Sequence, residues 1–454
     1  MKSIRVARLA NVILSTLTVS LLAACGDEAT LPKNADTGPD PQLPQPKSAM
    51  IPTVNIAPAV GWPANSKPHA APGLSVTAYA MGLDHPRWLY VLPNGDTLVA
   101  ETNAPTRPAD NPGLKNWAMG LVKKRAGAGV PSANRITLLH GLKSDGTAES
   151  KSVFLTGLNS PFGMALIGND FYVANTDSLV KFPYHAGDTK ITGPGVKVAD
   201  LPAGEINHYW TKSLVANADG SKLYVSVGSN SNIAENGIEN ETRRAAILEV
   251  DVTTGQSRVF ASGLRNANGL SWNPQSGALW AVVNERDELG SDLVPDYMTS
   301  IKDGGFYGWP YSYYGSHIDS RVTPQKPQLV AAAIKPDYAL GAHTASLGLA
   351  FDAAGAFPSQ YANGAFIGQH GSWNRKPHSG YKVAFVPFKE GKPAGELQDI
   401  LTGFLDSDGN AQGRPVGVAF DKTGSLLVAD DVGNAVWRVT ADGEAVKPQS
   451  RLVP

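Results

Sequence analysis

The feature that most constrains the fold is a short phrase that the chain repeats six times. Each copy has a glycine or proline turn, an apolar strand, a tight Asp/Asn-Gly-type turn and a second strand that ends in acidic or amide residues. The copies begin at Gly82, Gly157, Lys212, Gly263, Ala345 and Gly413. Irregular self-similarity at roughly 40–80 residues, with strand pairs and no helical period, is typical of a propeller. The six copies therefore predict an all-β fold, a six-bladed β-propeller.

The composition agrees with a fold rich in turns. The 454 residues include 42% hydrophobic and 17% charged residues, with 47 Gly and 33 Pro, which favours short strands over long amphipathic helices. The net charge is -1. Nucleic-acid binding relies on clustered Lys and Arg, so the overall charge predicts no nucleic-acid partner, although it is compatible with a local basic pocket.

The N-terminus predicts export and lipid attachment. Basic residues precede an apolar run over residues 9–24, which is shorter than the ~20 residues that a membrane-spanning helix needs. The run ends in the letters LAAC, and Cys25 is the only cysteine of the chain. This pattern resembles a bacterial lipoprotein signal, so we expect residues 1–25 to be a signal peptide ending at an acylated Cys25. The alternative is a free thiol beside an ordinary signal peptide.

The lipoprotein pattern also predicts a location. The chain is expected on the periplasmic side of a bacterial membrane, with its lipid anchor as the only membrane attachment. Gly26 follows the cysteine where an aspartate would indicate inner-membrane retention, which favours the outer membrane. Residues 26–73 are rich in Pro, Ala, Asn and Asp, and we interpret them as a flexible tether whose later part can lie against the propeller. Residues 74–454 are expected to form one closed propeller domain.

Several familiar catalytic motifs are absent from the sequence: HExxH, CxxC, G-x-S-x-G and the Walker loop. The candidates for chemistry are clusters of ionisable residues near strand ends, because the loops of all blades of a propeller meet at one mouth. His208 can accept a proton near neutral pH, although a structural histidine is the alternative. Arg265 and Asn266 can clamp a carbonyl or carboxylate oxygen, or form a salt bridge between blades.

Two further clusters predict a metal and an anionic ligand. Residues 284–292 combine carboxylates with a glycine that allows backbone carbonyls to point inward, as Ca²⁺ prefers, while a solvated charged loop is the alternative. His343, Arg375 and Arg414 fall at blade entrances, and Trp373 offers a flat face. Together they describe a cation-lined mouth suited to a planar polyanion.

Six stretches resemble one known family: GLRNANG, NERDELGSD, GGFYGWPY, HTASLGLAF, QHGSWNR and GRPVGVAF. They are similar to the sorbosone dehydrogenase and soluble aldose dehydrogenase group, whose cofactor is pyrroloquinoline quinone. The resemblance runs from about Gly82 to Val439, nearly the whole domain expected after the tether. That family folds as a six-bladed propeller, in agreement with the six repeats.

The resemblance implies a role for each candidate residue. His208 becomes the general base that takes the substrate hydroxyl proton while hydride moves to the quinone. The cofactor is contacted by Arg265, Asn266, His343, Arg375 and Arg414. A Ca²⁺ ion is held by the turn at Glu288, Leu289 and Gly290, with Asp292 as a further ligand. The substrate is then an aldose or related sugar, and the electron acceptor is left unassigned.

Three positions depart from the soluble glucose dehydrogenase branch of this family. That branch has an acid where this chain has Asn207, a lysine in place of Arg375, and a Gly-Pro pair in place of Leu289-Gly290. These differences favour the sorbosone dehydrogenase side. Two other classes of function stay open, namely a Ca²⁺-dependent propeller lactonase that needs no quinone, and a non-catalytic binding propeller.

Overall fold

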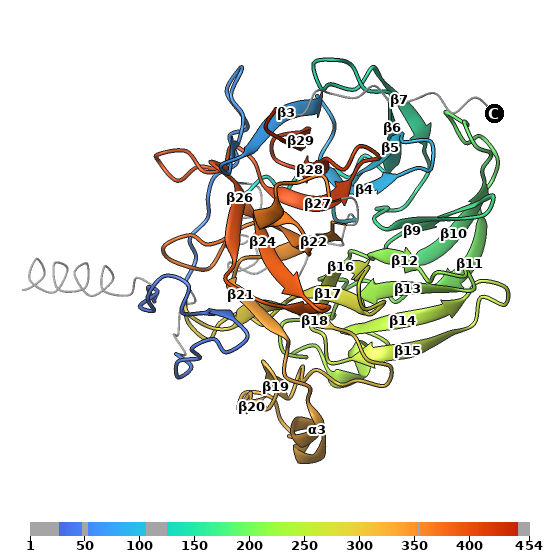
Figure 1. Ribbon diagram of the computed structural model, residues 1–454. Coiled ribbons are helices and arrows are strands. Elements are labelled where there is room, and N and C mark those ends of the chain that lie inside the picture. Colours follow the sequence, from blue (N-terminus) through green and yellow to red (C-terminus); the bar gives the residue numbers. More distant parts are fainter. Residues whose placement is uncertain (1–26, 48–52, 106–124, 353–354, 444–454) are drawn as a thin grey trace, which may run out of the picture.

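The computed structural model describes residues 27–47, 53–105, 125–352 and 355–443, so the predicted lipidation site Cys25 lies outside the described part. Within these ranges six sheets form the blades of a β-propeller (Figure 1). The prediction of an all-β, six-bladed propeller is confirmed. No helix in the described ranges is long and apolar enough to cross a membrane.

Blades 1 to 3 are four-stranded antiparallel sheets, and their strands follow one another in chain order from the inner to the outer edge. Blade 1 contains β4 (Pro86–Val91), β5 (Thr97–Glu101), β6 (Arg135–His140) and β7 (Ser150–Leu155). Blade 2 contains β8 (Met164–Ile167), β9 (Asp170–Ala174), β10 (Ser178–Pro183) and β11 (Val196–Asp200). Blade 3 contains β12 (Leu214–Ala216), β13 (Lys222–Val227), β14 (Ala246–Asp251) and β15 (Ser257–Ser262).

Blades 4 and 5 each gain a short strand from the N-terminal region. Blade 4 contains β16 (Asn266–Trp272), β17 (Leu279–Asn284), β18 (Pro295–Ser300) and β21 (Tyr338–Ala342), extended by β1 (Thr37–Gly38). Blade 5 contains β22 (Ser346–Phe351), β23 (Gly364–Gln369), β24 (Lys382–Lys389) and β26 (Gln398–Thr402), extended by β2 (His69–Ala70), and β25 (Lys392–Pro393) pairs with β24. Between β18 and β21 lie β19 (Ser312–Tyr313), β20 (His317–Ile318) and α3 (Pro327–Ala332).

Blade 6 closes the ring with strands from both ends of the domain. It contains β27 (Pro415–Phe420), β28 (Leu426–Asp430) and β29 (Ala435–Ala441), and its outer strand is β3 (Leu74–Met81) from the N-terminal side. In Figure 1, β3 in blue lies beside β29 in red. The first strands of the blades contact one another in a ring, and each of the six repeats opens one blade. Backbone pairing between the two ends thus holds the ring shut.

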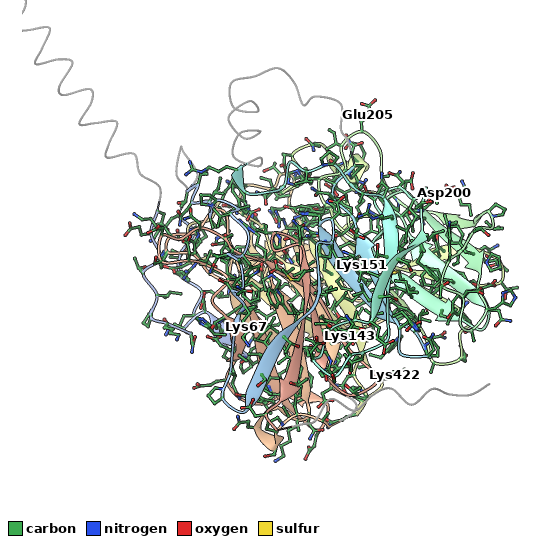
Figure 2. All side chains as sticks on the ribbon, turned by 90° about the horizontal axis from the view of Figure 1, so that it is seen from above. Lys67, Lys143, Lys151, Asp200, Glu205 and Lys422 are labelled. Carbon is green, nitrogen blue, oxygen red and sulfur yellow. The ribbon has the colours of Figure 1, made fainter. Side chains whose placement is uncertain are left out.

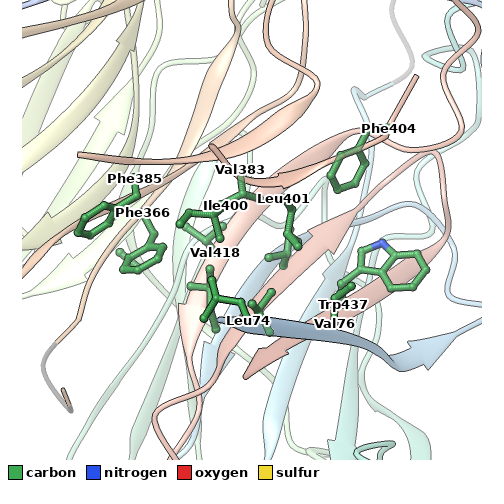
Figure 3. Packing of buried hydrophobic residues seen from close by; sticks show 14 of the residues in the cluster. Leu74, Val76, Phe366, Val383, Phe385, Ile400, Leu401, Phe404, Val418 and Trp437 are labelled. Atoms are coloured by element: carbon green, nitrogen blue, oxygen red, sulfur yellow. The ribbon is translucent and has the colours of Figure 1, made fainter. Parts of the chain in front are cut away.

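The blades pack through apolar side chains that alternate along the strands. Figure 3 shows the cluster between blades 5 and 6, with Phe366 and Phe385 at one side of it and Trp437 at the other. Near the propeller axis the strands pack so closely that a Cβ added to Gly368 would lie 2.2 Å from the backbone oxygen of Val416. Glycine is therefore required where these two inner strands approach.

All loops that bear the predicted site residues leave the blades at one end. The strands of a blade alternate in direction, so the loop before its first strand and the loop between its second and third strands share that end, which we call the mouth. Figure 2 shows Glu205, in the loop before β12, at the upper end of the view, and Lys422, in the β27–β28 turn, toward the opposite end.

The segment predicted as a tether lies against the propeller wherever it is described. We call residues 27–47 and 53–62 the N-terminal strap. At one end of the strap the backbone N–H of Ala29 donates to the carbonyl of Lys376 (2.7 Å), and at the other the Trp62 indole donates to Asp430 (2.7 Å) and packs on Trp437. Between these two points Lys47 donates to the carbonyl of Leu289 and Asn55 to the carbonyl of Trp373, so the strap borders the predicted site.

Candidate active site

The fold brings the predicted site residues to the mouth from four blades. Arg265, His343 and Arg414 precede the first strands β16, β22 and β27, and His208 lies in the loop before β12. Arg375 lies in the β23–β24 loop, and residues 285–294 form the β17–β18 loop. These positions are far apart in the sequence, and only closure of the ring makes them neighbours.

Asp287 is the centre of the site, and sequence reasoning did not single it out. Its carboxylate accepts from Arg265 Nη2 (2.8 Å) and Asn374 Nδ2 (2.9 Å), and His343 Nδ1 lies 3.6 Å away. Burial alone raises the pKa of Asp287, but Arg265 and His343 outweigh burial and hold this pKa well below its usual range. The carboxylate is therefore charged at neutral pH. The stretch NERDELGSD contained this residue, but nothing in it distinguishes Asp287 from the neighbouring acids.

Arg265 is held rigidly by groups around it. The guanidinium is 2% exposed and donates to Asn232 Oδ1 (2.9 Å), to the carbonyl of Glu285 and to the Tyr209 hydroxyl, and it lies 4.6 Å from the Tyr209 ring centroid. The neighbouring Asn266 is buried too, and its side-chain oxygen accepts from Asn268 (3.3 Å). Arg265 is therefore fixed in a dry setting, with the charged Asp287 as the anionic partner of its guanidinium.

In the turn predicted to hold the metal, the backbone carbonyls of Leu289 and Gly290 accept hydrogen bonds from N–H groups. The carbonyl of Leu289 accepts from the backbone N–H of Lys47 (2.9 Å), and the carbonyl of Gly290 accepts from His343 Nε2 (2.9 Å). Gly290 has a φ of 104°, a conformation that favours glycine. A carbonyl has two lone pairs, so both oxygens keep the capacity for a cation.

The two acidic residues predicted as metal ligands make protein contacts. Glu288 pairs with Arg321 (3.3 Å) and lines a recess, whereas Asp292 Oδ2 accepts from the backbone N–H (2.6 Å) and the hydroxyl (3.0 Å) of Thr30. Asp292 Oδ1 is buried and accepts no hydrogen bond from the described residues, while Arg375 Nη2 lies 3.6 Å away. The described ranges contain no group of three or more His, Cys, Asp or Glu residues that could hold a metal ion. Any cation here depends on carbonyl and ligand oxygens.

A second cluster of buried charged residues lies beside Arg414. Arg87 Nη1 donates to Asp431 Oδ2 (2.5 Å), and His370 Nε2 lies 2.9 Å from the same oxygen. Burial, partly opposed by Asp431, lowers the pKa of His370 to about 4, so this imidazole is neutral at pH 7. The Nε atoms of Arg87 and Arg414 are buried and have no acceptor among the described residues. Asp431 thus pairs with Arg87, whereas the Arg414 guanidinium donates to the carbonyl of Ala57 (3.2 Å) and lies 4.9 Å from the Tyr381 ring centroid.

His208 is exposed at the mouth on a loop that buried neighbours hold in place. Its ring lies 4.7 Å from the ring of Tyr209, the residue that binds Arg265. Asn207 is buried, donates to Thr176 Oγ1 (2.8 Å) and accepts from Arg244 (3.1 Å). Asn207 therefore anchors the loop that carries His208.

A small recess opens at this mouth. Its lining residues come from the β17–β18 loop, from the β23–β24 loop and from the strap: Glu288, Gly290, Trp373, Asn374, Asp27, Lys47 and Thr53. The mouth thus combines a small recess, a charged carboxylate and several buried cations.

Comparison with known proteins places the chain in a family. The model of the TrAA12-like family matches residues 131–302 and 322–442, which is more than half of the chain. The chain belongs to the TrAA12-like family. Structures of the Trichoderma reesei Carbohydrate-Active Enzymes Family AA12 protein, one an iodide and one a calcium structure, superpose with TM-scores of 0.67 and 0.66. Each is 19% identical and covers 86% of this chain and 99% of the other, which shows a shared fold.

Curated relatives are similar over part of their length. An uncharacterized protein of Borreliella burgdorferi is 31% identical over 241 residues, which is 53% of this chain and 62% of that protein. A pyrroloquinoline quinone-dependent pyranose dehydrogenase of Coprinopsis cinerea is 23% identical over 372 residues, which is 68% of this chain and 50% of that protein. The matches therefore span less than two thirds of these relatives.

Proposed function

We propose that this chain is a quinoprotein dehydrogenase that oxidises an aldose or related sugar at its reducing carbon, with pyrroloquinoline quinone and Ca²⁺ as cofactors. The observation that carries the proposal is the dry, cation-rich mouth around Arg265, Arg87 and Arg414. Two relatives support the cofactors. The pyrroloquinoline quinone-dependent pyranose dehydrogenase of Coprinopsis cinerea supports the quinone, and the calcium structure of the AA12 protein supports the metal.

The residues at the mouth fit an anionic, planar cofactor. The buried Nε atoms of Arg87 and Arg414 lack acceptors among the described residues, and an unpaired buried donor is costly unless a ligand pairs with it. A carboxylate of the cofactor supplies such an acceptor. Arg375, which donates through Nε to the carbonyl of Ser291 (2.9 Å), and His343 would line the same site. Trp373 is only partly buried and offers a flat surface beside it.

The metal also fits, with oxygen donors as its main partners. The carbonyls of Leu289 and Gly290 and the carboxylate of Glu288 would contribute ligands, with Asp292 Oδ1, which accepts no hydrogen bond from the described residues, as a further one. Ca²⁺ needs six to eight oxygens, so cofactor or water oxygens would complete the shell. When bound, the quinone supplies the carbon that accepts hydride.

The protein's own groups would move the proton and hold the charge. His208 is exposed, stands beside Tyr209 and can take the hydroxyl proton of the sugar as it is oxidised. Arg265, with Asn266 beside it, stays fixed by its contacts and would stabilise negative charge as it develops on the cofactor oxygens. Asp287 keeps Arg265 and His343 in position.

The test uses the chain from residue 26 onward, loaded with pyrroloquinoline quinone and Ca²⁺. Cofactor absorbance and thermal shift report loading, and dye reduction across a panel of sugars reports turnover. His208→Ala should lower kcat by ~10²- to 10⁴-fold with cofactor loading unchanged, as for loss of a general base. His185→Ala is the matched control, since His185 is 77% exposed and pairs with Asp188 in its own turn. Absence of loading refutes the proposal.

The same assay separates the other classes of function. Lactone hydrolysis with Ca²⁺ and no quinone would identify a lactonase, and silence in both assays would identify a binding propeller. We propose further that the chain is a lipoprotein acylated at Cys25 on the periplasmic side of the membrane, on the strength of the N-terminal pattern. Cys25→Ala should then abolish incorporation of a labelled fatty acid.

A further inference from the structure

The N–H groups of Arg265 are all engaged inside the protein. Nε donates to the carbonyl of Asn232 (3.3 Å), and Nη1 donates to the carbonyls of residues 284 and 285. Nη2 donates to Asn232 Oδ1 (2.9 Å), to Asp287 Oδ2 (2.8 Å) and to the Tyr209 hydroxyl. A guanidinium has five N–H donors, so these contacts use its full capacity. Arg265 therefore acts on a ligand most directly through a group that it already binds.

Tyr209 differs from the other partners of Arg265, because it has a hydrogen of its own to donate. The other partner atoms are carbonyl, amide and carboxylate oxygens, which only accept. The Tyr209 oxygen accepts from Arg265 Nη2, and its O–H donates to no acceptor within the described ranges of the chain. The hydroxyl hydrogen of Tyr209 can therefore be donated to a ligand.

The ring of Tyr209 is held between two residues of the proposed site. Arg265 Cζ lies 4.6 Å from the centroid of this ring, and the His208 ring lies 4.7 Å from it. A Cβ added to Gly228 would lie 2.4 Å from the Tyr209 Cβ, so the base of the side chain packs on the backbone that follows β13. Tyr209 nevertheless stays partly exposed at the mouth. Its hydroxyl is thus placed precisely and is accessible to a ligand.

The hydroxyl of Tyr209 keeps its proton at neutral pH. Burial raises its pKa above the usual value, Arg265 opposes this rise only in part, and Asp287 adds to it. A neutral hydroxyl that accepts a hydrogen bond from a cation becomes a stronger donor, since hydrogen bonds in a chain polarise one another. Arg265 therefore strengthens Tyr209 as a donor without removing its proton.

We propose that Tyr209 is a further catalytic residue, whose O–H donates to the quinone oxygen on which negative charge develops, with Arg265 acting through it. This inference rests on the proposed function, because it assigns a cofactor contact in the same site. In the reaction the sugar loses a hydride to the cofactor and a proton to His208, and Tyr209 keeps its own proton. A donor that is already in position stabilises the charge brought by the hydride.

The test compares Tyr209→Phe with Tyr338→Phe in protein loaded with pyrroloquinoline quinone and Ca²⁺. Phenylalanine keeps the ring beside Arg265 and His208 and removes only the hydroxyl. Tyr338 is the matched control, because its hydroxyl donates to the carbonyl of Gly395 (2.9 Å), between the third and fourth strands of blade 5 and so away from the mouth. Both variants should unfold within about 2 °C of the wild type, since each loses one hydrogen bond.

Three measurements on Tyr209→Phe have defined outcomes. The Kd for the quinone, from titration of its absorbance, should rise about five- to tenfold, as for loss of one hydrogen bond. The absorbance maximum of the bound quinone should shift, because its oxygen loses a donor. The value of kcat should fall about 10²-fold with KM for glucose within about twofold, as for removal of a donor to a developing charge. Tyr338→Phe should leave all three unchanged.

Contrary results overturn the inference in recognisable ways. An unchanged quinone affinity and spectrum in Tyr209→Phe overturn it, whatever happens to kcat. A change confined to KM for glucose also overturns it, since the hydroxyl would then contact the sugar. A fall in Tm above about 5 °C with an unaltered spectrum would assign Tyr209 a structural role only.

Failure of this inference can be told from failure of the proposed function. If the wild type loads the quinone and oxidises the sugar while Tyr209→Phe matches it in every measurement, the inference fails and the proposed function stands. If the wild type does not load the quinone, both fail.

Discussion

Replacement of Asp287 by asparagine tests whether this carboxylate organises the mouth. The substitution keeps the shape of the side chain and removes its charge. Arg265 and Asn374 donate to different oxygens of the Asp287 carboxylate. Asparagine has one side-chain oxygen, so its NH2 group would face one of these two donors. Arg265 would then remain buried without an anionic partner.

The expected cost follows from the burial of this ion pair. Breaking a buried pair by removing one partner costs about 3–5 kcal/mol. The Asp287 side chain is 17% exposed and Arg265 retains other acceptors, so we expect the lower end, about 3 kcal/mol. With about 390 described residues, and an unfolding entropy near 2 cal/mol/K per residue, this corresponds to a fall in Tm of about 4 °C.

Thermal unfolding of the variant and wild type between pH 8 and pH 4 measures this cost. The pKa of Asp287 is depressed in the folded protein, so its stabilising contribution is present above the unfolded pKa of about 4 and is lost as the pH falls further. Burial lowers the pKa of His343, but Asp287 outweighs burial and raises this pKa above its usual value. The Tm difference should therefore widen as His343 becomes protonated between pH 8 and pH 5. Asp303→Asn, which disrupts the exposed Arg258–Asp303 pair, is the matched control and should not shift Tm measurably. A difference below 1 °C for Asp287→Asn, or one that shrinks between pH 8 and pH 6, would refute the reasoning.

Three other perturbations have defined outcomes. Asp431→Asn leaves its buried arginine and histidine partners facing each other and should lower stability by about 3–5 kcal/mol in denaturant unfolding; a loss under 1 kcal/mol contradicts this. Burial, with a smaller contribution from a nearby arginine, lowers the pKa of Lys212 to about 7. The loss of folding stability caused by burying this amine is therefore largest below pH 7, and it falls as the pH rises toward 10. Lys212→Met should therefore stabilise the protein by about 3 kcal/mol more at pH 6 than at pH 9, and an equal gain at both pH values argues against a charged buried amine. Gly368→Ala places a methyl group 2.2 Å from the Val416 oxygen and should yield no soluble folded protein, whereas normal yield and Tm would show that the inner strands can separate.

The blades and the positions of most candidate residues were predictable from sequence, because both depend on local patterns. Each repeat encodes a turn, an apolar strand and a return strand, and short-range alternation is enough to specify this unit. Arg265, His343 and Arg414 follow the same turn at each blade entrance, so counting repeats placed them at one end of the ring. The roles assigned to them came from resemblance to a family and stay proposals.

The rest of the site depends on contacts between residues that no local pattern connects. Asp287 lies among several acids with the same local pattern, and only its position opposite Arg265 and His343 gives it a depressed pKa. Arg87 and Asp431 are 344 residues apart, and they meet because the first and last blades close on each other. Their pairing could not be read from either segment.

The sequence alone determined the number of blades and the end of the ring at which chemistry is expected, since both follow from a repeated local unit. Tertiary structure alone decided which charges are paired and what borders the mouth. The N-terminal strap shows the reason. Its composition is that of a flexible linker, and its place is set by single hydrogen bonds between Asp27, Thr30 and Asn55 and loops more than 250 residues away. Contacts of that range exist only after the ring has closed and brought those loops together.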